Sequence, residues 1–291
     1  MTPRALLLLG LLAAIGAGCG PGGKTPEALG VLTFNLRNGM AQDGPDGWAY
    51  RRDMVGRLVA REAPAVMGVQ EAWQYQLDEL LERVPGYAWV GVPRSNVAQI
   101  DEHCAVFYRT DRFALVETGT FWLSDTPDEP TTKFSELQCC LRVVTWAALE
   151  SLESGRVLHA FNTHFDTIAA DQIPQRSAAL VARRIDELAG TGTALLTGDF
   201  NQPVGSDAYR ILTGALEFGG VRGGLVDPWA ALGLPEEGSF HRFTGVATGT
   251  SRIDWVLGSA DLGSVGGRVL HDQEDGRYPS DHFPVAAAFE W

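Results

Sequence analysis

Hydrophobic and polar positions alternate in several short segments of the chain, a pattern that predicts β-strands. In VLTFNLRNG (residues 31–39), Leu32, Phe34 and Leu36 alternate with their neighbours until the turn dipeptide Asn38-Gly39. Short apolar runs predict further strands at residues 65–73, 105–109, 143–151, 156–166, 193–201, 252–259 and 284–291.

Apolar residues spaced three and four apart predict helices between some of these strands. One helix is expected over residues 51–64 and a second over residues 73–83. The clearest covers residues 172–190, with Pro174 in its first turn and Gly190 at its end. Because so few helices separate the strands, a simple doubly wound sheet does not fit. We expect an α/β sandwich of mixed sheets with helices outside.

The N-terminus differs from the rest of the chain. Arg4 precedes an apolar run over residues 5–17, which has the length of a signal-peptide core and is too short to span a bilayer. Small residues before Cys19 resemble a bacterial lipoprotein signal, although Gly16 stands where that pattern usually has Leu. Residues 1–18 are therefore expected to be a lipoprotein signal peptide, with Cys19 lipidated. Plain secretion and a buried N-terminal helix are the alternatives.

The expected product is an exported, membrane-anchored lipoprotein, periplasmic or on the cell surface, built as one domain. Gly and Pro mark residues 19–29 as a flexible tether. Residues 30–291 show no repeat or linker, and the chain has 45% hydrophobic and 20% charged residues, a globular composition. A monomer is expected.

Three cysteines follow Cys19, so they cannot all pair with one another. An exported protein can form one disulfide, of Cys104 with either Cys139 or Cys140, and unpaired thiols are the alternative. No cysteine spacing suggests a zinc site.

Net charge limits the candidate partners. The chain carries a formal charge of −13, which disfavours general binding to nucleic acid through phosphate neutralisation. A local basic patch or a bound cation can override net charge, so nucleic acid stays a possible partner that the charge does not favour.

Polar side chains stand at or near the ends of six apolar strands. They are Asn35, Glu71, His164, Asp199, Asn201, Asp254, Asp281 and His282, with Asp166 as a further, more structural candidate. Unpaired buried charges cost several kcal/mol each, so these residues are expected to converge on one acidic cleft. Carboxylate and amide oxygens without thiolates favour Mg²⁺ or Mn²⁺.

Six motifs in order, TFNLRNG, GVQEAW, FNTHFDT, LTGDFN, SRIDWVLGS and SDHFPV, resemble the endonuclease/exonuclease/phosphatase superfamily of metallophosphoesterases. The resemblance covers nearly all of the expected mature chain. WAYRRDMV, GTFWLSDTP and DGRYPSDHFPV further resemble a bacterial exported branch. The resemblance implies a four-layer α/β sandwich, in which helices flank two packed mixed β-sheets and the site lies at one rim.

The resemblance also implies which residues serve the metal. Glu71 matches the metal-ligand glutamate, and Asn35 matches the asparagine beside the metal and phosphate. Asp281 is expected to serve the metal directly or through water, with a turn role as the alternative.

The catalytic roles follow from the same resemblance. Asp199 matches the residue that positions or deprotonates the attacking water, and Asn201 matches the amide that holds the phosphoryl oxygen. His282 matches the histidine of the SDH motif, oriented by Asp254. His164 matches a phosphate contact or leaving-group acid.

Three more residues are candidates for substrate binding. His241 lies in a loop that this branch is expected to bring to the site, Arg142 can meet phosphate, and Trp122 can form an apolar wall. The alternatives are an internal ion pair for Arg142, as for Arg51, and core packing for Trp122.

The expected function is divalent-metal-dependent hydrolysis of a phosphoester, with a phosphodiester favoured. An extracellular nuclease and a phosphomonoesterase are alternatives within this chemistry. Outside it stand a non-catalytic binding module of the same fold and a glycan hydrolase with paired carboxylates.

Overall fold

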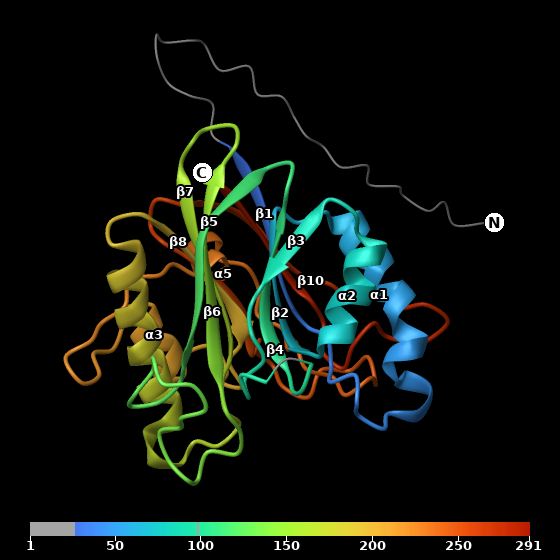
Figure 1. The fold of residues 1–291 in the computed structure, drawn as a ribbon, viewed down its shortest axis with the longest axis horizontal. Coiled ribbons are helices and arrows are strands. Elements are labelled where there is room, and N and C mark those ends of the chain that lie inside the picture. Colours follow the sequence, from blue (N-terminus) through green and yellow to red (C-terminus); the bar gives the residue numbers. More distant parts are fainter. Residues whose placement is uncertain (1–26, 98) are drawn as a thin grey trace.

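The computed structural model describes residues 27–97 and 99–291, as Figure 1 shows. The expected signal peptide, the lipidation site Cys19 and most of the expected tether lie outside the described residues. Within the described part, no helix has the length and apolar character needed to cross a membrane.

Eleven strands and five α-helices are present among the described residues. The strands are β1 Ala28–Asn35, β2 Val66–Ala72, β3 Tyr87–Val90, β4 His103–Arg109, β5 Phe113–Trp122, β6 Val143–Ser151, β7 Val157–His164, β8 Thr193–Asp199, β9 Asp254–Gly258, β10 Gly263–Val269 and β11 Val285–Glu290. The helices are α1 Trp48–Glu62, α2 Gln74–Arg83, α3 Ile173–Ala189, α4 Asp207–Leu212 and α5 Pro228–Leu232, with short 3₁₀ turns at Gly44–Asp46 and Ala170–Gln172.

The strands form two mixed sheets, as the sequence predicted. One has the order β10-β11-β1-β2-β4-β3, and the other has the order β5-β6-β7-β8-β9. In Figure 1, α1 and α2 lie beside the first sheet and α3 beside the second. The expected four-layer α/β sandwich is confirmed.

Three apolar clusters hold the four layers together. Val31, Val66 and Val106 of the first sheet pack with Leu158 and Leu195 of the second. Two further clusters join α1 and α2 to the first sheet and α3 to the second. Apolar residues on both faces of each central strand explain why the strands read as nearly continuous apolar runs.

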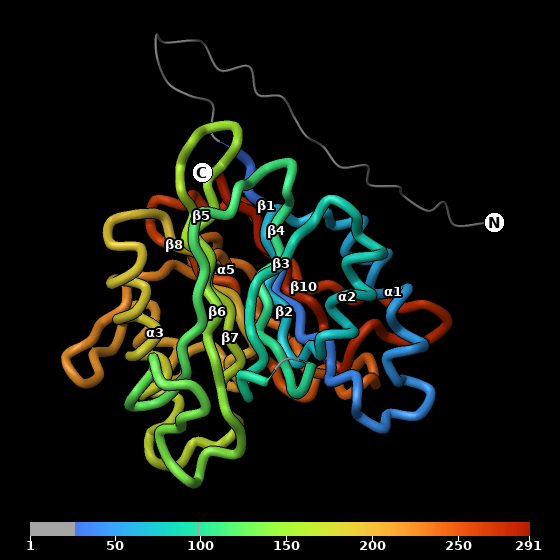
Figure 2. Tube along the Cα trace, in the orientation of Figure 1, coloured from blue at the N-terminus to red at the C-terminus, as the bar shows by residue number. Residues whose placement is uncertain are grey.

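The start of the folded domain was placed two residues too late by the sequence pattern. β1 begins at Ala28, so the expected tether of residues 19–29 is wrong in its last two residues. Glu27 N donates to Trp291 O at 2.7 Å, and β1 pairs with β11 from Ala28 onward. Figure 2 shows this pairing of the blue first strand with the red C-terminal strands.

The strand ends that matter for function meet at one edge. β1 runs parallel to β2, and β7 runs parallel to β8, so the carboxyl ends of all four strands point the same way within their sheets. β9 is antiparallel to β8 and therefore begins where β8 ends. The polar residues at these ends are thereby brought together.

Candidate active site

Three neighbouring strands of the second sheet place three polar side chains in direct register. His164 at the end of β7 pairs with Asp199 at the end of β8, and Asp199 pairs with Asp254 at the start of β9. Side chains of directly paired residues project from the same face of a sheet. All three are buried. The edge therefore holds two carboxylates and an imidazole on one face.

Glu71 reaches this edge from the first sheet through an irregularity in β2. The pairing of β2 with β4 shifts between Val69 and Ala72. Glu71 has a φ of 59°, in the left-handed region, a strain that costs about 1–3 kcal/mol in a non-glycine residue. Such bulges redirect side chains and are frequent beside active sites. Glu71 Oε2 accepts a hydrogen bond from Asn38 N at 2.8 Å.

A buried amide from the second sheet supports the irregularity. Asn162 Nδ2 donates to the carbonyls of Val69 at 2.8 Å and Ala105 at 2.9 Å, at the place where the pairing shifts. Asn162 Oδ1 accepts from Gln70 Nε2 at 2.7 Å. A Cβ on Gly68 would lie 2.4 Å from Asn162 Oδ1, so the close approach of the sheets requires glycine. Gln70 and Asn162 were not predicted to support the site, although an amide side chain within an apolar strand can be recognised in the sequence.

Asn35 lies between the carboxylates of the two sheets. Its Nδ2 donates to Glu71 Oε1 and to Asp199 Oδ2, each at 3.0 Å. Its Oδ1 accepts from Arg37 N at 2.9 Å. The side chain expected beside the metal is thus present at the site, with its amide nitrogen placed where two negative charges meet.

His282 enters the site just before β11 and is fixed by a carboxylate. His282 Nδ1 lies 2.9 Å from Asp254 Oδ2, and its Nε2 lies 3.7 Å from Asp199 Oδ2. Ser239 Oγ donates to the same oxygen of Asp254 at 2.6 Å. This arrangement orients the imidazole ring so that Nε2 faces Asp199.

Arg51 of α1 holds the turn that carries the SDH motif. Its Nη1 donates to the carbonyls of Leu36 at 3.0 Å and Pro279 at 2.5 Å. The side chain is buried and its guanidinium lies 5.3 Å from the ring centre of Phe243. Among the described residues Arg51 forms no ion pair with a carboxylate, and it instead binds backbone carbonyls beside the site.

Burial and neighbouring charge shift the pKa values of the two central groups upward. Burial, aided by the nearby Asp254 carboxylate, raises the pKa of Asp199 to about 7. Burial opposes a charge on His282, but the Asp254 and Asp199 carboxylates outweigh it and raise its pKa to about 10. At neutral pH His282 therefore keeps its proton and Asp199 keeps its proton in part, because two buried carboxylates share one imidazolium.

His164 and Asn201 form a second polar pair in the site. Asn201 Nδ2 donates to His164 Nε2 at 2.9 Å and to Phe165 O at 3.0 Å. Asn201 N donates to Asp199 Oδ1 at 2.9 Å. Burial, together with the charges of Arg142 and His282, holds the pKa of His164 well below its usual value. In this state His164 is a neutral hydrogen-bond acceptor, the opposite of the protonated form that a leaving-group acid needs.

Asp281 lies at the border of the site and faces a guanidinium. Its Oδ2 is 3.7 Å from Arg37 Nε, and its Oδ1 accepts from Ser280 Oγ at 3.3 Å. Burial and the nearby Glu71 charge raise its pKa, while His282 and Arg37 oppose that shift.

Two overlapping groups of side chains could hold a divalent cation. Among residues 27–97 and 99–291, Glu71, His164 and Asp199 bring one ligand atom each within 4.8 Å of one another, as do Asp199, Asp254 and His282. The imidazole of each group already has a hydrogen-bond partner, Asn201 for His164 and Asp254 for His282, and Glu71, the metal ligand expected from the sequence, belongs to the first group. The two carboxylates and the unprotonated imidazole nitrogen of that group suit a divalent metal. Asp281 belongs to neither group.

A small cavity adjoins Glu71 and His164 and carries two guanidinium groups. It is lined by Glu71, Arg94, Glu102, His103, Cys104, Leu141, Arg142, Val143 and His164. Arg94 forms ion pairs with Asp101 at 2.7 Å and Glu102 at 2.8 Å. Arg142 is buried, and its Nε lies 3.9 Å from Asp166 Oδ2 without a hydrogen-bond partner. Sequence reasoning proposed Arg142 but missed Arg94 and Glu102.

Two residues that were expected to contact substrate, His241 and Trp122, are buried. His241 is fully buried, stacks on Phe283 at 3.8 Å, and donates its backbone N–H to Asp281 O at 2.8 Å. Trp122 is buried beside Cys104, and its Nε1 donates to Arg94 O at 2.8 Å. Both side chains pack behind groups of the site, and a substrate contact for either residue stays a prediction.

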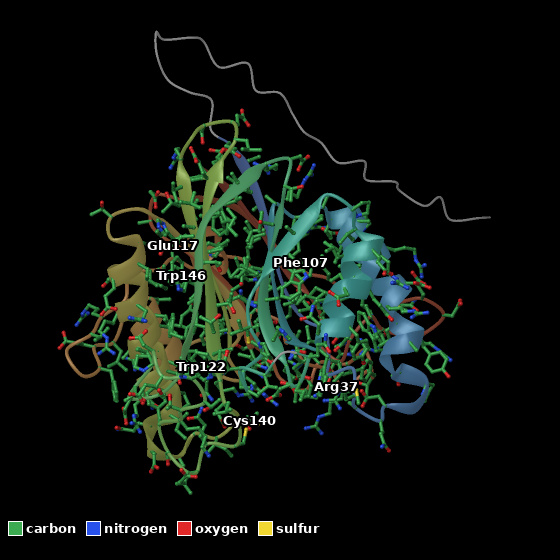
Figure 3. All side chains as sticks on the ribbon, in the orientation of Figure 1. Arg37, Phe107, Glu117, Trp122, Cys140 and Trp146 are labelled. Carbon is green, nitrogen blue, oxygen red and sulfur yellow. The ribbon has the colours of Figure 1, made fainter. Side chains whose placement is uncertain are left out.

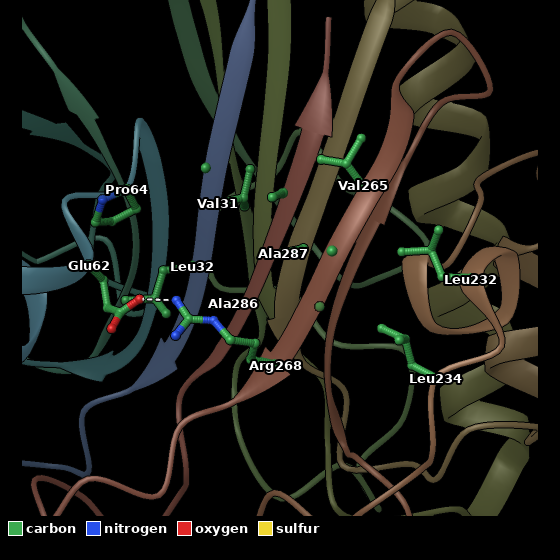
Figure 4. Close-up of a pocket in the computed structure, with 14 residues that line it drawn as sticks. Val31, Leu32, Glu62, Pro64, Leu232, Leu234, Val265, Arg268, Ala286 and Ala287 are labelled. Carbon is green, nitrogen blue, oxygen red and sulfur yellow. Dashed lines mark hydrogen bonds and ion pairs between the residues drawn. The ribbon is translucent and has the colours of Figure 1, made fainter. Parts of the chain in front are cut away.

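A larger cavity of about 480 Å³, drawn in Figure 4, shares no lining residue with the candidate site. It is lined mostly by small or apolar residues, including Gly30, Leu232 and Val265. Its only charged lining residues, Glu62 and Arg268, form an ion pair with each other. Cavity size therefore does not mark the catalytic end of this fold.

Comparison with known proteins identifies a family for this architecture. The Endonuclease/Exonuclease/phosphatase family matches residues 32–282. A crystal structure of a protein of this family from Bacteroides thetaiotaomicron is 32% identical, with a TM-score of 0.81, and the match covers 91% of this chain and 98% of that one. A mannosyl-6-phosphatase from the same organism is 31% identical, with a TM-score of 0.79, and the match covers 90% of this chain and 100% of that one.

A viral sequence is also similar. An uncharacterized protein of Acanthamoeba polyphaga mimivirus is 26% identical over 166 residues, which are 53% of this chain and 59% of that protein. This chain thus matches less than two thirds of the viral relative's length.

Proposed function

Because the chain belongs to the endonuclease/exonuclease/phosphatase family, we propose that it hydrolyses a phosphoester with the help of a divalent cation. The observation that carries the proposal is the convergence of Glu71, Asp199 and His282 from three strand ends. The cost of burying these ions, with Asp254 Oδ1 left without a hydrogen-bond partner among the described residues, favours a bound cation over a purely structural role.

Glu71, Asp199 and His164 are the residues that would hold the cation, with Asn35 beside them. When bound, Mg²⁺ or Mn²⁺ supplies a Lewis acid that stabilises negative charge on a phosphoryl oxygen. Added positive charge would also lower the pKa of Asp199 and keep it ionised near neutral pH.

The proton chemistry belongs to Asp199 and His282. As a carboxylate, Asp199 orients the attacking water and accepts its proton, which is typically worth about 10²–10⁴ in rate. The His282 imidazolium is held by Asp254 with Nε2 directed into the site. It donates a charged hydrogen bond to the phosphoryl oxygen as negative charge develops there. Asn201 keeps Asp199 and His164 in place through its two amide groups.

We further propose that the substrate is a phosphomonoester with a hydroxyl-rich leaving group, such as a sugar phosphate. Similarity to the mannosyl-6-phosphatase over 90% of this chain supports this class. A monoester dianion carries more negative charge than a diester, and Arg142 and Arg94 stand beside Glu71 to meet it. The phosphodiester favoured from the sequence alone is the competing substrate, and the net charge of −13 opposes a long polyanion.

The proposal is tested by measuring hydrolysis by residues 24–291. Mannose 6-phosphate, an aryl phosphomonoester and the matching diester are compared with Mg²⁺, with Mn²⁺ and with a chelator. We expect turnover that the chelator abolishes, faster on the monoesters, and lost in His282→Ala.

Turnover that persists in chelator would overturn the role of the cation. Faster hydrolysis of the diester would overturn the monoester assignment and leave the catalytic proposal standing. A folded, metal-loaded protein inactive on monoesters, diesters, lipid phosphates and oligonucleotides would overturn the proposed function.

A further inference from the structure

Two adjacent cysteines lie in the loop between β5 and β6, next to the candidate site. Cys139 is exposed and Cys140 is half-buried, and their Sγ atoms are only 3.0 Å apart. Two unbonded sulfur atoms normally pack farther apart than this. Figure 3 shows Cys140 at the same end of the molecule as Arg37, which faces Asp281.

We propose that Cys139 and Cys140 are a redox modification site, which closes reversibly to a vicinal disulfide when the protein meets a disulfide oxidant. Such oxidants are low-molecular-weight disulfides or protein thiol–disulfide oxidoreductases. They act in the oxidising compartments that receive exported proteins, where disulfides persist. The modification itself does not depend on the proposed function. Its kinetic consequence, described below, does.

The reaction is ordinary thiol–disulfide exchange. One cysteine, as its thiolate, attacks a sulfur of the external disulfide, and one thiolate of that oxidant leaves. The second cysteine, as its thiolate, then attacks the mixed disulfide and displaces the other half of the oxidant. Two S–H bonds are lost and one S–S bond forms in the protein, while the oxidant's S–S bond is reduced to two thiols.

The remaining cysteine of the described chain is not a suitable partner. Cys104 is buried with Trp122 and Val143, and burial raises the pKa of its thiol to about 12. A neutral, buried thiol is a poor nucleophile. All three thiols are free, which is the unpaired alternative left open by the sequence. The geometry favours the adjacent pair instead.

Formation of the Cys139–Cys140 disulfide would change the contacts of Arg142, because Arg142 lies near Cys139 and shares Asp166 with Cys140. Arg142 Nη2 lies 3.9 Å from Cys139 Sγ, and its Nε lies 3.9 Å from Asp166 Oδ2. The same oxygen of Asp166 accepts from Cys140 N at 3.3 Å, and that N–H belongs to the peptide inside the new ring. Oxidation therefore shifts two of the contacts that position Arg142 beside Glu71 and His164.

The first test is a mass map of the reduced protein after treatment with oxidised glutathione and alkylation of the remaining thiols. We expect the peptide with Cys139 and Cys140 to lose two hydrogens and to take no alkyl group. Cys139→Ser and Cys140→Ser should abolish that product, and Cys104→Ala should keep it. Because burial and the hydrogen bond to Cys140 raise the pKa of Cys139 to about 11, closure should be faster at pH 9 than at pH 7.

Complete alkylation of both cysteines after oxidation would overturn the proposal, as would disulfides formed only between molecules. The second measurement is KM for the aryl monoester. We expect a rise of roughly tenfold on oxidation, the size of one weakened charged hydrogen bond, reversed by reductant and absent in Cys140→Ser. An unchanged KM in a protein with the mapped disulfide would overturn the link to Arg142. The mass map decides the disulfide even if the proposed hydrolysis fails.

Discussion

Two buried ionic clusters stand two residues apart in the sequence, each with two carboxylates and one cation, and they differ in how these charges are compensated. Arg252 binds Asp227 Oδ2 at 2.9 Å and Glu236 Oε1 at 2.6 Å, and its guanidinium stacks 3.7 Å from the ring centre of Trp229. Asp254, on the next strand, belongs instead to the group with Asp199 and His282. The first cluster gives its cation an aromatic face and a partly exposed carboxylate, Glu236, although Arg252 Nη1 has no hydrogen-bond partner among the described residues.

The second cluster has the same formal charges, but they are less compensated because both of its carboxylates are buried. Asp199 and Asp254 share one imidazole, and Asp254 Oδ1 is buried without a hydrogen-bond partner among the described residues. The pKa of Asp199 rises to about 7 as a consequence of burial and the nearby carboxylate. The comparison teaches that burial of charge alone does not identify a functional site. Two buried carboxylates that share one imidazole, one of them with a raised pKa, mark such a site more clearly.

The largest expected effect comes from removing charge at the less compensated cluster. Asp199→Asn should lower kcat by roughly 10³-fold, because the proton acceptor is lost. It should also leave the melting temperature unchanged or raise it, since a buried carboxylate with a raised pKa destabilises the fold when ionised. Phosphate release and thermal unfolding at pH 8 measure both. Asp207→Asn, an exposed residue on α4, is the control, and near-normal turnover in Asp199→Asn would contradict the assignment.

The opposite result is expected at the better compensated cluster. Arg252→Met leaves Asp227 buried without its cation and should lower the free energy of unfolding by about 3–5 kcal/mol. Urea unfolding measures the loss. Arg222→Met, whose exposed ion pair with Glu217 spans 3.8 Å, should change stability by less than about 1 kcal/mol. Equal losses in the two variants would remove the distinction between the clusters.

The cluster of Asp199, Asp254 and His282 should also make the free energy of unfolding depend on pH. Ionisation of Asp199 between its ordinary pKa of 3.8 and about 7 destabilises the fold, because burial raises its folded-state pKa. Stabilisation from charged His282 is full below about pH 6.5 and is lost as the pH rises through about 10. Both changes have the same sign, but the lowered pKa of His164 acts in the opposite direction below about pH 6.5, so the unfolding free energy of chelator-treated protein should fall from pH 7 to pH 9.

Thermal unfolding across this range, with and without Mn²⁺, checks the expectation. Asp199→Asn should flatten the acid part of the curve, and added cation should offset the loss at high pH. A stability curve that rises from pH 7 to pH 9 in the chelated protein would contradict the raised pKa of His282 at this site.

The smallest effect is expected at Trp122. Trp122→Phe removes one buried hydrogen bond to Arg94 O and should cost about 1 kcal/mol of stability, with kcat and KM unchanged. Steady-state kinetics together with urea unfolding separate the two readouts. A tenfold change in KM would instead support the substrate contact predicted for Trp122 from the sequence.

Element types along the chain were predictable where the apolar pattern was long. The helix expected over residues 73–83 is α2, with Trp73 at its N-cap, and α3 spans Ile173–Ala189 within the expected range. β3, β5 and β10 were missed. Five of the ten β5 residues are exposed, and β10 is rich in glycine, so neither gives a continuous apolar signal.

The candidate site was predictable in its chemistry and less so in its contacts. Asn35, Glu71, Asp199 and His282 do converge, because parallel strands deliver their carboxyl ends to one edge. Burial of His241 was invisible in the sequence, since a loop residue gives no sign of what will cover it.

By itself the sequence determined where most of the strands lie along the chain, the polar residues at their ends and the family whose motifs they match. These depend on local periodicity and on residue type, which are properties of adjacent positions. The tertiary structure alone decided the bulge that turns Glu71 inward, the amide of Asn162 that supports it, and the approach of Cys139 and Cys140 to Arg142. Those contacts depend on how two sheets and a long loop pack, and packing distances between segments far apart in sequence leave no periodic trace in the chain.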